Sequence, residues 1–296
     1  MHAPAPAPRS QLMPVLAVVA GIATFSMMDA AIKGASLAVG VYSALLFRNL
    51  FGALMTFPLW LAAGRPMPSR QVLKVHALRA GITSAMAALF FYGLARIPMA
   101  EGIALSFVSP IIALYFAALL LGETIRRQAI AASLLGVVGV VVILGGKLGG
   151  GAYSGEALTG TLAVLASSVF YAVNLVLQRK QALLASPVEV AMAQNLIVTL
   201  IFLVFSPWFA VLPEVRSLGL IAAGAAFATA ALLFLAWGYA RAETQVLLPI
   251  EYTGFLWAAL LGWLMFDEAL GFATVAGTLL IVVGCWIGAR NAMTST

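Results

Sequence analysis

Long apolar stretches with almost no charge are the feature that most constrains this chain. Residues 13–31, 129–145 and 218–240 approach or reach the roughly 20 apolar residues that a helix needs to cross a hydrocarbon core about 30 Å thick. Hydrophobic residues make up 63% of the sequence and charged residues 9%, so there is too little polar surface to cover a globule in water. A membrane β-barrel would show short segments of alternating polarity, and none is visible. The sequence therefore predicts an all-α integral membrane protein surrounded by the lipid bilayer.

Ten transmembrane helices are predicted from the apolar runs between charged, glycine and proline residues. They cover residues 12–32, 41–63, 77–95, 101–121, 129–146, 158–178, 188–210, 218–239, 245–265 and 271–289. The stretch 145–160 holds seven glycines and reads as a flexible connector between the fifth and sixth helices. The predicted organisation is a disordered tail at 1–11, five helices at 12–146, an external linker at 147–157, five helices at 158–290 and a tail at 291–296.

The two sides of this connector resemble each other in sequence. GLARIPMAEGIALSFVSPIIALYFAALLLGETI, which starts at Gly93, aligns without a gap with GYARAETQVLLPIEYTGFLWAALLGWLMFDEAL, which starts at Gly238, and Glu123 then matches Glu268. Because five helices is an odd number, the second half must enter the membrane from the opposite side, so the repeat is inverted. Inverted repeats are typical of secondary transporters, in which rocking one part against another exposes a central site to each side in turn.

Lysine and arginine residues near the predicted helix ends set the orientation. Placing the N-terminus inside puts eleven of them in cytoplasmic segments and four in external segments. Since cytoplasmic segments carry an excess of these residues, both termini are predicted to be cytoplasmic. This orientation also accounts for the net charge of +6, so nucleic acid is not expected as a partner.

Two stretches within the aligned segments carry a family resemblance. LSFVSPIIALYFAALLLGE and PIEYTGFLWAALLGWLMFDE resemble the fourth and ninth helices of EamA-type transporters in the drug/metabolite transporter superfamily. The resemblance covers nearly the whole chain as two repeats and points, within the family, to aromatic amino acid exporters. It implies a ten-helix exporter of small metabolites in a bacterial-type inner membrane. The family glycine before the acidic residue is Gly122 in the first half, whereas Asp267 takes its place in the second.

Polar side chains inside the predicted spans are the candidate substrate-binding residues. Such groups are costly in hydrocarbon and usually face a bundle interior or a watery cavity. The first candidates are three pairs that match between the halves: Ser84 with Thr229, Ser106 with Glu251, and Asn49 with Asn195. The hydroxyls could also satisfy carbonyls of their own helices, and the asparagines are harder to satisfy locally.

Charged residues inside the spans leave several roles open. Arg48 lies about seven residues, or about 10 Å, from the outer end of its span, where it either extends outward or binds a carboxylate. Asp29 and Lys33 lie on one helical face and are predicted to form an ion pair at the outer boundary. Glu251 is predicted to face the carrier interior, where it meets a substrate ammonium, takes up a proton or pairs with a basic group at the inner gate. A structural hydrogen bond is the alternative for Glu251.

Aromatic and proline residues complete the candidate site. Phe25, Tyr252 and Trp257 are predicted to line it, because a subset of aromatic rings would bind an apolar or aromatic side chain by stacking and area burial. Pro110 in the fourth span and Pro249 in the ninth interrupt helical hydrogen bonding at near-symmetric positions. They are the candidate hinges.

Motifs and residue types that the sequence lacks restrict the possible classes of function. Cys285 is the only cysteine, which excludes an internal disulfide and a cysteine-based metal site, and no metal or cofactor is predicted. No HExxH, GxSxG or P-loop motif suggests an enzyme. Phosphorylated cargo would need several basic groups facing the interior, and only Arg48 lies deep in a predicted span.

These observations predict a secondary transporter that exports small zwitterionic or neutral metabolites by alternating access. Amino acids with aromatic or apolar side chains are the first choice of small-molecule substrate. Drugs and nucleoside-like metabolites are the alternative cargo, and a non-transporting membrane protein of carrier ancestry is a further alternative. No feature of the sequence sets an oligomeric state.

Overall fold

The computed structural model describes residues 12–64, 67–109, 111–112, 115–116, 127–148, 155–182, 184–239, 241 and 250–292, and all regular structure in these residues is helical. The helices are α1 (Leu12–Val39), α2 (Val41–Ala62), α3 (Arg70–Leu94), α4 (Met99–Ser106), α6 (Arg127–Leu148), α7 (Gly155–Ala182), α8 (Pro187–Phe209), α9 (Val215–Tyr239), α11 (Gly254–Phe266) and α12 (Phe272–Ala292). The tail 1–11 and the candidate hinges Pro110 and Pro249 lie outside the described residues.

Each of the ten predicted ranges overlaps one of these helices, although most bounds differ by a few residues and only part of the ranges 101–121 and 245–265 is described as helix. Within the described part of the chain, α1, α2, α3, α7, α8 and α9 contain segments long and apolar enough to cross a membrane, and shorter apolar helices cover Leu134–Gly146, Gly254–Phe266 and Phe272–Gly284. Large apolar side chains are exposed on the outside of the bundle, among them Phe272 at 88% and Trp208 at 74%. Surfaces of this kind suit a lipid environment, so the chain is a multi-pass integral membrane protein.

The start of α3 differs from the prediction. The helix begins at Arg70, seven residues earlier than the predicted 77. Ser69 caps it, because its hydroxyl accepts a hydrogen bond from the Val72 amide at 3.3 Å. The polar first turns of α3 are therefore helical although they lack the apolar pattern of a membrane span.

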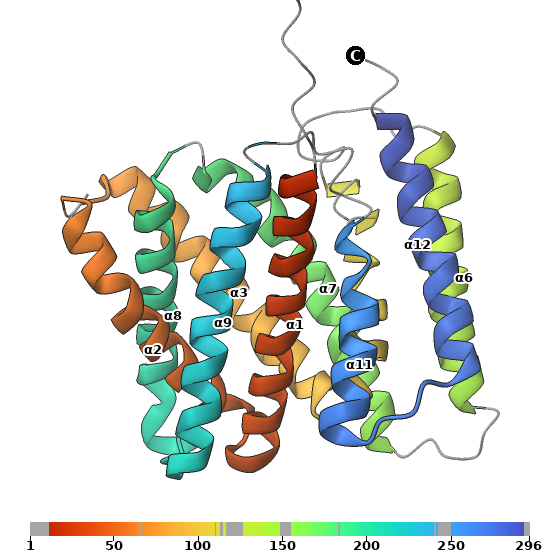
Figure 1. Ribbon diagram of the computed structural model, residues 1–296, viewed down its shortest axis with the longest axis horizontal. Coiled ribbons are helices and arrows are strands. Elements are labelled where there is room, and N and C mark those ends of the chain that lie inside the picture. The colour runs from red at the N-terminus through yellow and green to blue at the C-terminus, as the bar shows by residue number, and fades with distance from the viewer. Residues whose placement is uncertain are drawn as a thin grey trace, which may run out of the picture.

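The principal neighbours of each helix lie in the other half of the chain. Helix α1 packs against α9 and α3 against α7, which joins the first helix of each repeat to the third helix of the other. The other three pairs each join the helices at the same position in the two repeats: α2 with α8, α4 with α11, and α6 with α12. Helix α1 starts at the upper end of Figure 1 and its counterpart α7 at the lower end, so equivalent helices run in opposite directions. The described helices thus show two inverted repeats.

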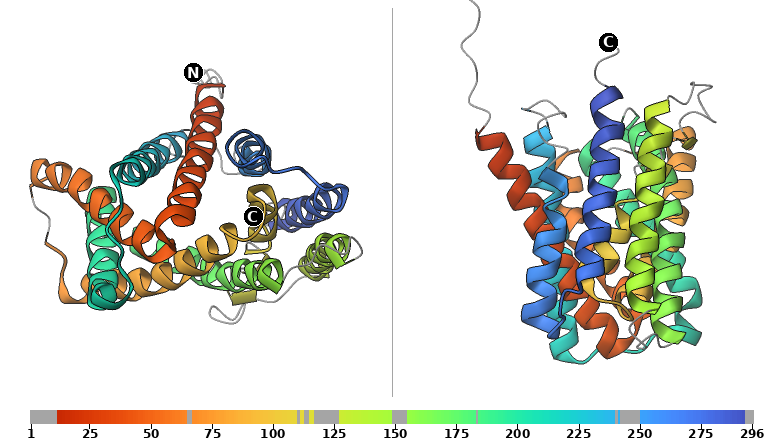
Figure 2. Two further views of the ribbon diagram at one scale, coloured as in Figure 1. Left: turned by 90° about the horizontal axis from the view of Figure 1, so that it is seen from below. Right: turned by 90° about the vertical axis from the view of Figure 1, so that its right-hand side faces the viewer.

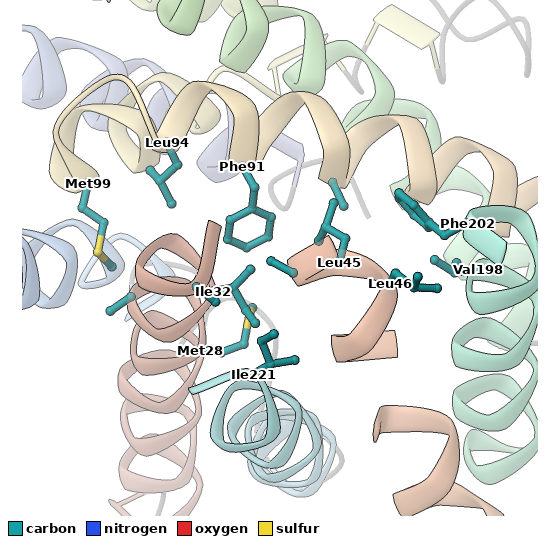
Figure 3. Packing of buried hydrophobic residues seen from close by; sticks show 14 of the residues in the cluster. Met28, Ile32, Leu45, Leu46, Phe91, Leu94, Met99, Val198, Phe202 and Ile221 are labelled. Carbon is teal, nitrogen blue, oxygen red and sulfur yellow. The ribbon is translucent and has the colours of Figure 1, made fainter. Parts of the chain in front are cut away.

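The main core lies where α1, α2, α3, α8 and α9 meet. Figure 3 shows Ile32 of α1, Leu45 of α2, Phe91 of α3 and Ile221 of α9 pointing toward one another, and each is at most 3% exposed. Gly40, with a φ of 79°, joins α1 to α2 as a single residue, a conformation that glycine adopts without steric cost. This tight reversal keeps the C-terminal end of α1 beside the start of α2.

Helices α6 and α12 form a pair at one side of the molecule (Figures 1 and 2). They approach closely at Gly139 and Gly277, where a Cβ on Gly277 would lie 2.5 Å from the Gly139 carbonyl oxygen. Helix α1 starts and α12 ends at the same end of the bundle, the upper end in Figure 1.

Candidate functional site

A cluster of charged and polar side chains lies inside the bundle. Asp29 of α1 and Arg48 of α2 interact electrostatically, and the phenol of Tyr171 in α7 interacts with Asp29, Glu251 and Arg79. Glu251 lies immediately before α11. The cluster therefore draws on helices of both repeats, as expected for a site between two pseudo-symmetric halves.

Members of this cluster keep part of their surface accessible. Asp29, Arg48, Arg79 and Glu251 are half-buried, and Tyr171 is 38% exposed. Polar groups that keep accessible surface are available to a small molecule.

Asp29 and Lys33 do not form the predicted ion pair. Lys33 is 3% exposed, and its ammonium pairs with Glu268, 235 residues further along the chain. It also donates to the Ile97 carbonyl oxygen at 2.8 Å. The prediction was wrong because Lys33 lies in the last turns of α1, where its long side chain reaches the segments after α3 and α11, while Asp29 interacts with Arg48 of α2.

The turn after α11 positions Glu268 for this pair. Asp267 is left-handed, with φ 53°, and the Glu268 amide donates to the Gly262 carbonyl oxygen at 3.1 Å, which closes the helix end. The second carboxylate oxygen of Glu268 accepts from the Met99 amide at 2.6 Å, at the first turn of α4. Gly262 leaves room for this carboxylate, because a Cβ there would lie 2.5 Å from Glu268 Oε2. Glu268 thus ties α11 of the second repeat to α1 and α4 of the first.

Arg79 is the interior residue that the sequence interpretation missed. It lies nine residues into α3, or about 14 Å from the start of the helix. The sequence interpretation did not single out Arg79, because it placed the start of this helix at 77, only two residues before Arg79. The signal was present in Pro68 and Ser69, since a serine that caps a helix predicts a start at Arg70.

The predicted hydroxyls each bond within their own helix. They donate to the carbonyl oxygen four residues earlier at 2.8, 2.9 and 3.0 Å, in the pairs Ser84–Ala80, Ser106–Gly102 and Thr229–Ala225. Ser84 is buried, whereas Ser106 and Thr229 are half-buried. Local bonding of this kind matches the structural alternative for these three residues.

The predicted asparagines lie where α2 crosses α8. Asn49 is 7% exposed and donates to the Leu45 carbonyl oxygen at 2.7 Å. Asn195 packs against Gly52, where a Cβ would lie 2.7 Å from its amide oxygen. The structure brings the two asparagines to one helix crossing, which they share with the small residue that permits close approach.

One of the three predicted aromatic residues is adjacent to Glu251. Tyr252 follows it directly and meets Phe107 edge to face, with ring centroids 5.2 Å apart and an interplanar angle of 88°. Trp257 lies in the first turn of α11 and is half-buried. Phe25 instead packs against the main core from α1. In the part of the chain that the structure describes, no three His, Cys, Asp or Glu residues form a group that could hold a metal ion.

A helical membrane protein with two inverted repeats and an interior charge cluster between them has the architecture of a secondary carrier. The chain belongs to the EamA-like transporter family, whose model matches residues 12–145 and 158–289, and the predicted family resemblance is thereby confirmed.

Relatives of this chain include two kinds of exporter. It is 30% identical over 273 residues to the pseudopaline exporter CntI of Pseudomonas aeruginosa, which covers 92% of this chain and 93% of that protein. It is 29% identical over 211 residues to the aromatic amino acid exporter YddG of Ancylobacter novellus, or 67% and 68% of the two chains. A solved crystal structure shares the fold with a TM-score of 0.62 at 23% identity, over 95% of this chain and 98% of the other.

Proposed function

We propose that the protein is a secondary transporter that exports a small zwitterionic metabolite, with amino acids as the first candidates. The observation that carries this proposal is that both signs of charge gather around Tyr171: Asp29, which interacts with Arg48, and Glu251 both interact with its phenol. A zwitterion satisfies both signs of charge at once, whereas a phosphorylated metabolite would leave the carboxylates opposed to its own charge.

The aromatic rings beside Glu251 support an apolar or aromatic side chain on the cargo. Tyr252, which follows Glu251, and Phe107, which meets Tyr252 edge to face, would offer ring faces and edges next to the carboxylate that would receive the substrate ammonium. The aromatic amino acid exporter among the relatives supports the same cargo class.

A second candidate is a metabolite like pseudopaline. Similarity to the pseudopaline exporter extends over 92% of this chain, compared with 67% for the aromatic amino acid exporter, and this wider coverage favours including it. With either cargo, the proposed protein is an exporter that works by alternating access in a bacterial inner membrane.

The deciding experiment is uptake into proteoliposomes that contain the purified full chain. Labelled amino acids, nucleosides, nucleotide sugars and pseudopaline are offered separately and as competitors. We expect uptake of apolar or aromatic amino acids, mutual competition among them, and no competition by nucleotide sugars. If pseudopaline is taken up and amino acids are not, the second candidate is the cargo. Uptake of nucleotide sugars would contradict the proposal of a zwitterionic cargo.

Glu251→Gln is the informative variant in this assay, because it keeps the shape of the side chain and removes its charge. Slower amino acid uptake with an unchanged yield of folded protein is the expected result. Uptake at the parental rate would show that the carboxylate charge has no part in transport.

A further inference from the structure

Arg79 is held by three neutral amide side chains of α7. Its Nε donates to Asn174 Oδ1 at 2.9 Å, Nη1 donates to Gln181 Oε1, and Nη2 donates to Gln178 Oε1 at 3.3 Å. The three amides are spaced four and three residues apart, so one face of α7 presents all of them to α3. A guanidinium has five N–H groups, and these bonds leave two of them for another acceptor.

Neighbouring side chains fix the amides in turn. Gln181 and His76 are both fully buried and hydrogen-bonded to each other, and the other ring nitrogen of His76 lies 3.3 Å from Glu189 Oε1. Thr83 donates to the Asn174 amide oxygen at 3.2 Å. The guanidinium is therefore positioned before any ligand arrives, which lowers the entropy that binding costs.

Within the part of the chain that the structure describes, no carboxylate pairs with Arg79. In the described residues the ion pairs join Lys33 to Glu268 and His76 to Glu189, and all hydrogen-bond acceptors of Arg79 are uncharged. Arg48, by contrast, interacts with Asp29. A half-buried guanidinium held by neutral amides is a site for an anion, and its planar fork matches a carboxylate.

Tyr171 interacts both with the Arg79 guanidinium and with acidic residues. Its phenol interacts electrostatically with Arg79 and also with Glu251 and Asp29. Groups that attract a cation and a group that attracts an anion therefore lie around one tyrosine side chain, and Arg79 is half-buried, so part of it is accessible.

We propose that Arg79 binds the carboxylate of the transported molecule, while Asp29 and Glu251, the acidic residues that interact with Tyr171, receive its ammonium. The inference rests on the proposed function, and it makes Arg79 the residue that distinguishes zwitterions from amines. Gln178, Gln181 and Asn174 are positioning residues in this arrangement, because they hold the guanidinium without touching the cargo.

Matched substrate pairs test the proposal in proteoliposomes. Phenylalanine and leucine are each compared with their carboxamides, which keep the amine and the side chain but lack the carboxylate. The parental protein should carry the acids in preference to the amides. Arg79→Gln should lower kcat/KM for the acids by about 10- to 100-fold and change that for the amides less than about twofold, because only the acids lose a charge-assisted bond.

Two further variants separate recognition from folding. Arg79→Lys keeps the charge without the planar fork, so it should retain a preference for acids with a raised KM for them. Arg216→Gln removes the same charge from an exposed residue of α9 and should match the parental protein. If Arg79→Gln yields no folded protein, the lysine variant decides, and an unchanged KM for the acids overturns the proposal.

The remaining outcomes separate the inference from the proposed function. Equal losses for acids and amides in Arg79→Gln, or an unchanged ratio between them, would assign Arg79 a structural role while the cargo class stands. A parental protein that carries acids and amides alike would also remove the Arg79 inference alone. If the parental protein takes up neither the acids nor the carboxamides, both the Arg79 inference and the amino acid proposal are wrong.

Discussion

At the scale of single residues, Lys33 and Glu268 show how a buried charge is accommodated. Their side chains are 4% and 16% exposed, and each carries further hydrogen bonds, to the Ile97 carbonyl and from the Met99 amide. Glu101, 1% exposed, adds a second carboxylate that interacts electrostatically with Lys33. Removing one partner from such a pair leaves the other charge enclosed and uncompensated.

Lys33→Met should therefore destabilise the protein by about 3–5 kcal/mol, the range for breaking a buried ion pair. The measurement is the midpoint of thermal unfolding in detergent, with exposed Lys74→Met as the matched control. Combining Lys33→Met with Glu268→Gln should recover part of the loss, because the enclosed carboxylate is then neutral. Equal midpoints for the Lys33 and Lys74 variants would contradict this account.

The residue scale also marks where sequence interpretation succeeds and where it fails. Arg48 and Glu251 were found as candidates because polar groups inside apolar spans are rare, and the structure brings both into the interior cluster. Whether they bind substrate stays a prediction. The partner of Lys33 could not be found, because local spacing favoured Asp29 and the true partner lies 235 residues away. Arg79 was missed through an error in one helix boundary.

At the scale of helices, close packing depends on a few glycines whose neighbours are backbone atoms. Gly139 and Gly277 face each other across α6 and α12, and neither helix has room for a Cβ at the crossing. The family and its two repeats were predictable, because the aligned segments carry the pattern of each half. The partner of each helix was not, since pairing across the repeats depends on three-dimensional contacts rather than on any one run of residues.

Gly277→Ala should push α6 and α12 apart. Its Cβ would lie 2.5 Å from both the Gly139 carbonyl oxygen and Ile143 Cγ1, so at least one helix must move, at a cost of about 1–3 kcal/mol. Gly219→Ala in α9 is the matched control, because no atom lies within 4 Å of a Cβ there. Alanine also favours the helix over glycine by up to about 1 kcal/mol, so the control should be unchanged or slightly more stable. A similar unfolding midpoint for both variants would show that the α6–α12 crossing tolerates expansion.

At the scale of the whole molecule, the two ends of the bundle should lie on opposite sides of the membrane. We propose that the end at which α1 starts and α12 ends is cytoplasmic, as the distribution of Lys and Arg favours. In a Cys285→Ala background, Gly155→Cys at the start of α7 should react with an impermeant thiol reagent in intact cells. Met67→Cys, between α2 and α3 and at a residue 80% exposed, should react only after lysis. The reverse pattern would invert the proposed orientation.

The pairing of helices across the two repeats has a consequence for synthesis. Helix α6 ends at Leu148 and its partner α12 begins at Phe272, so more than one hundred residues must be translated before the two can meet. At about 5–20 residues per second, this interval lasts roughly 5 to 25 seconds. During that time the helices of the first repeat lack the partners against which they pack in the complete protein. Gly139, which packs against α12, lies on one of these uncovered surfaces. The nascent half must therefore stay in the membrane, shielded by lipid or by the insertion machinery, until the ribosome has delivered the second.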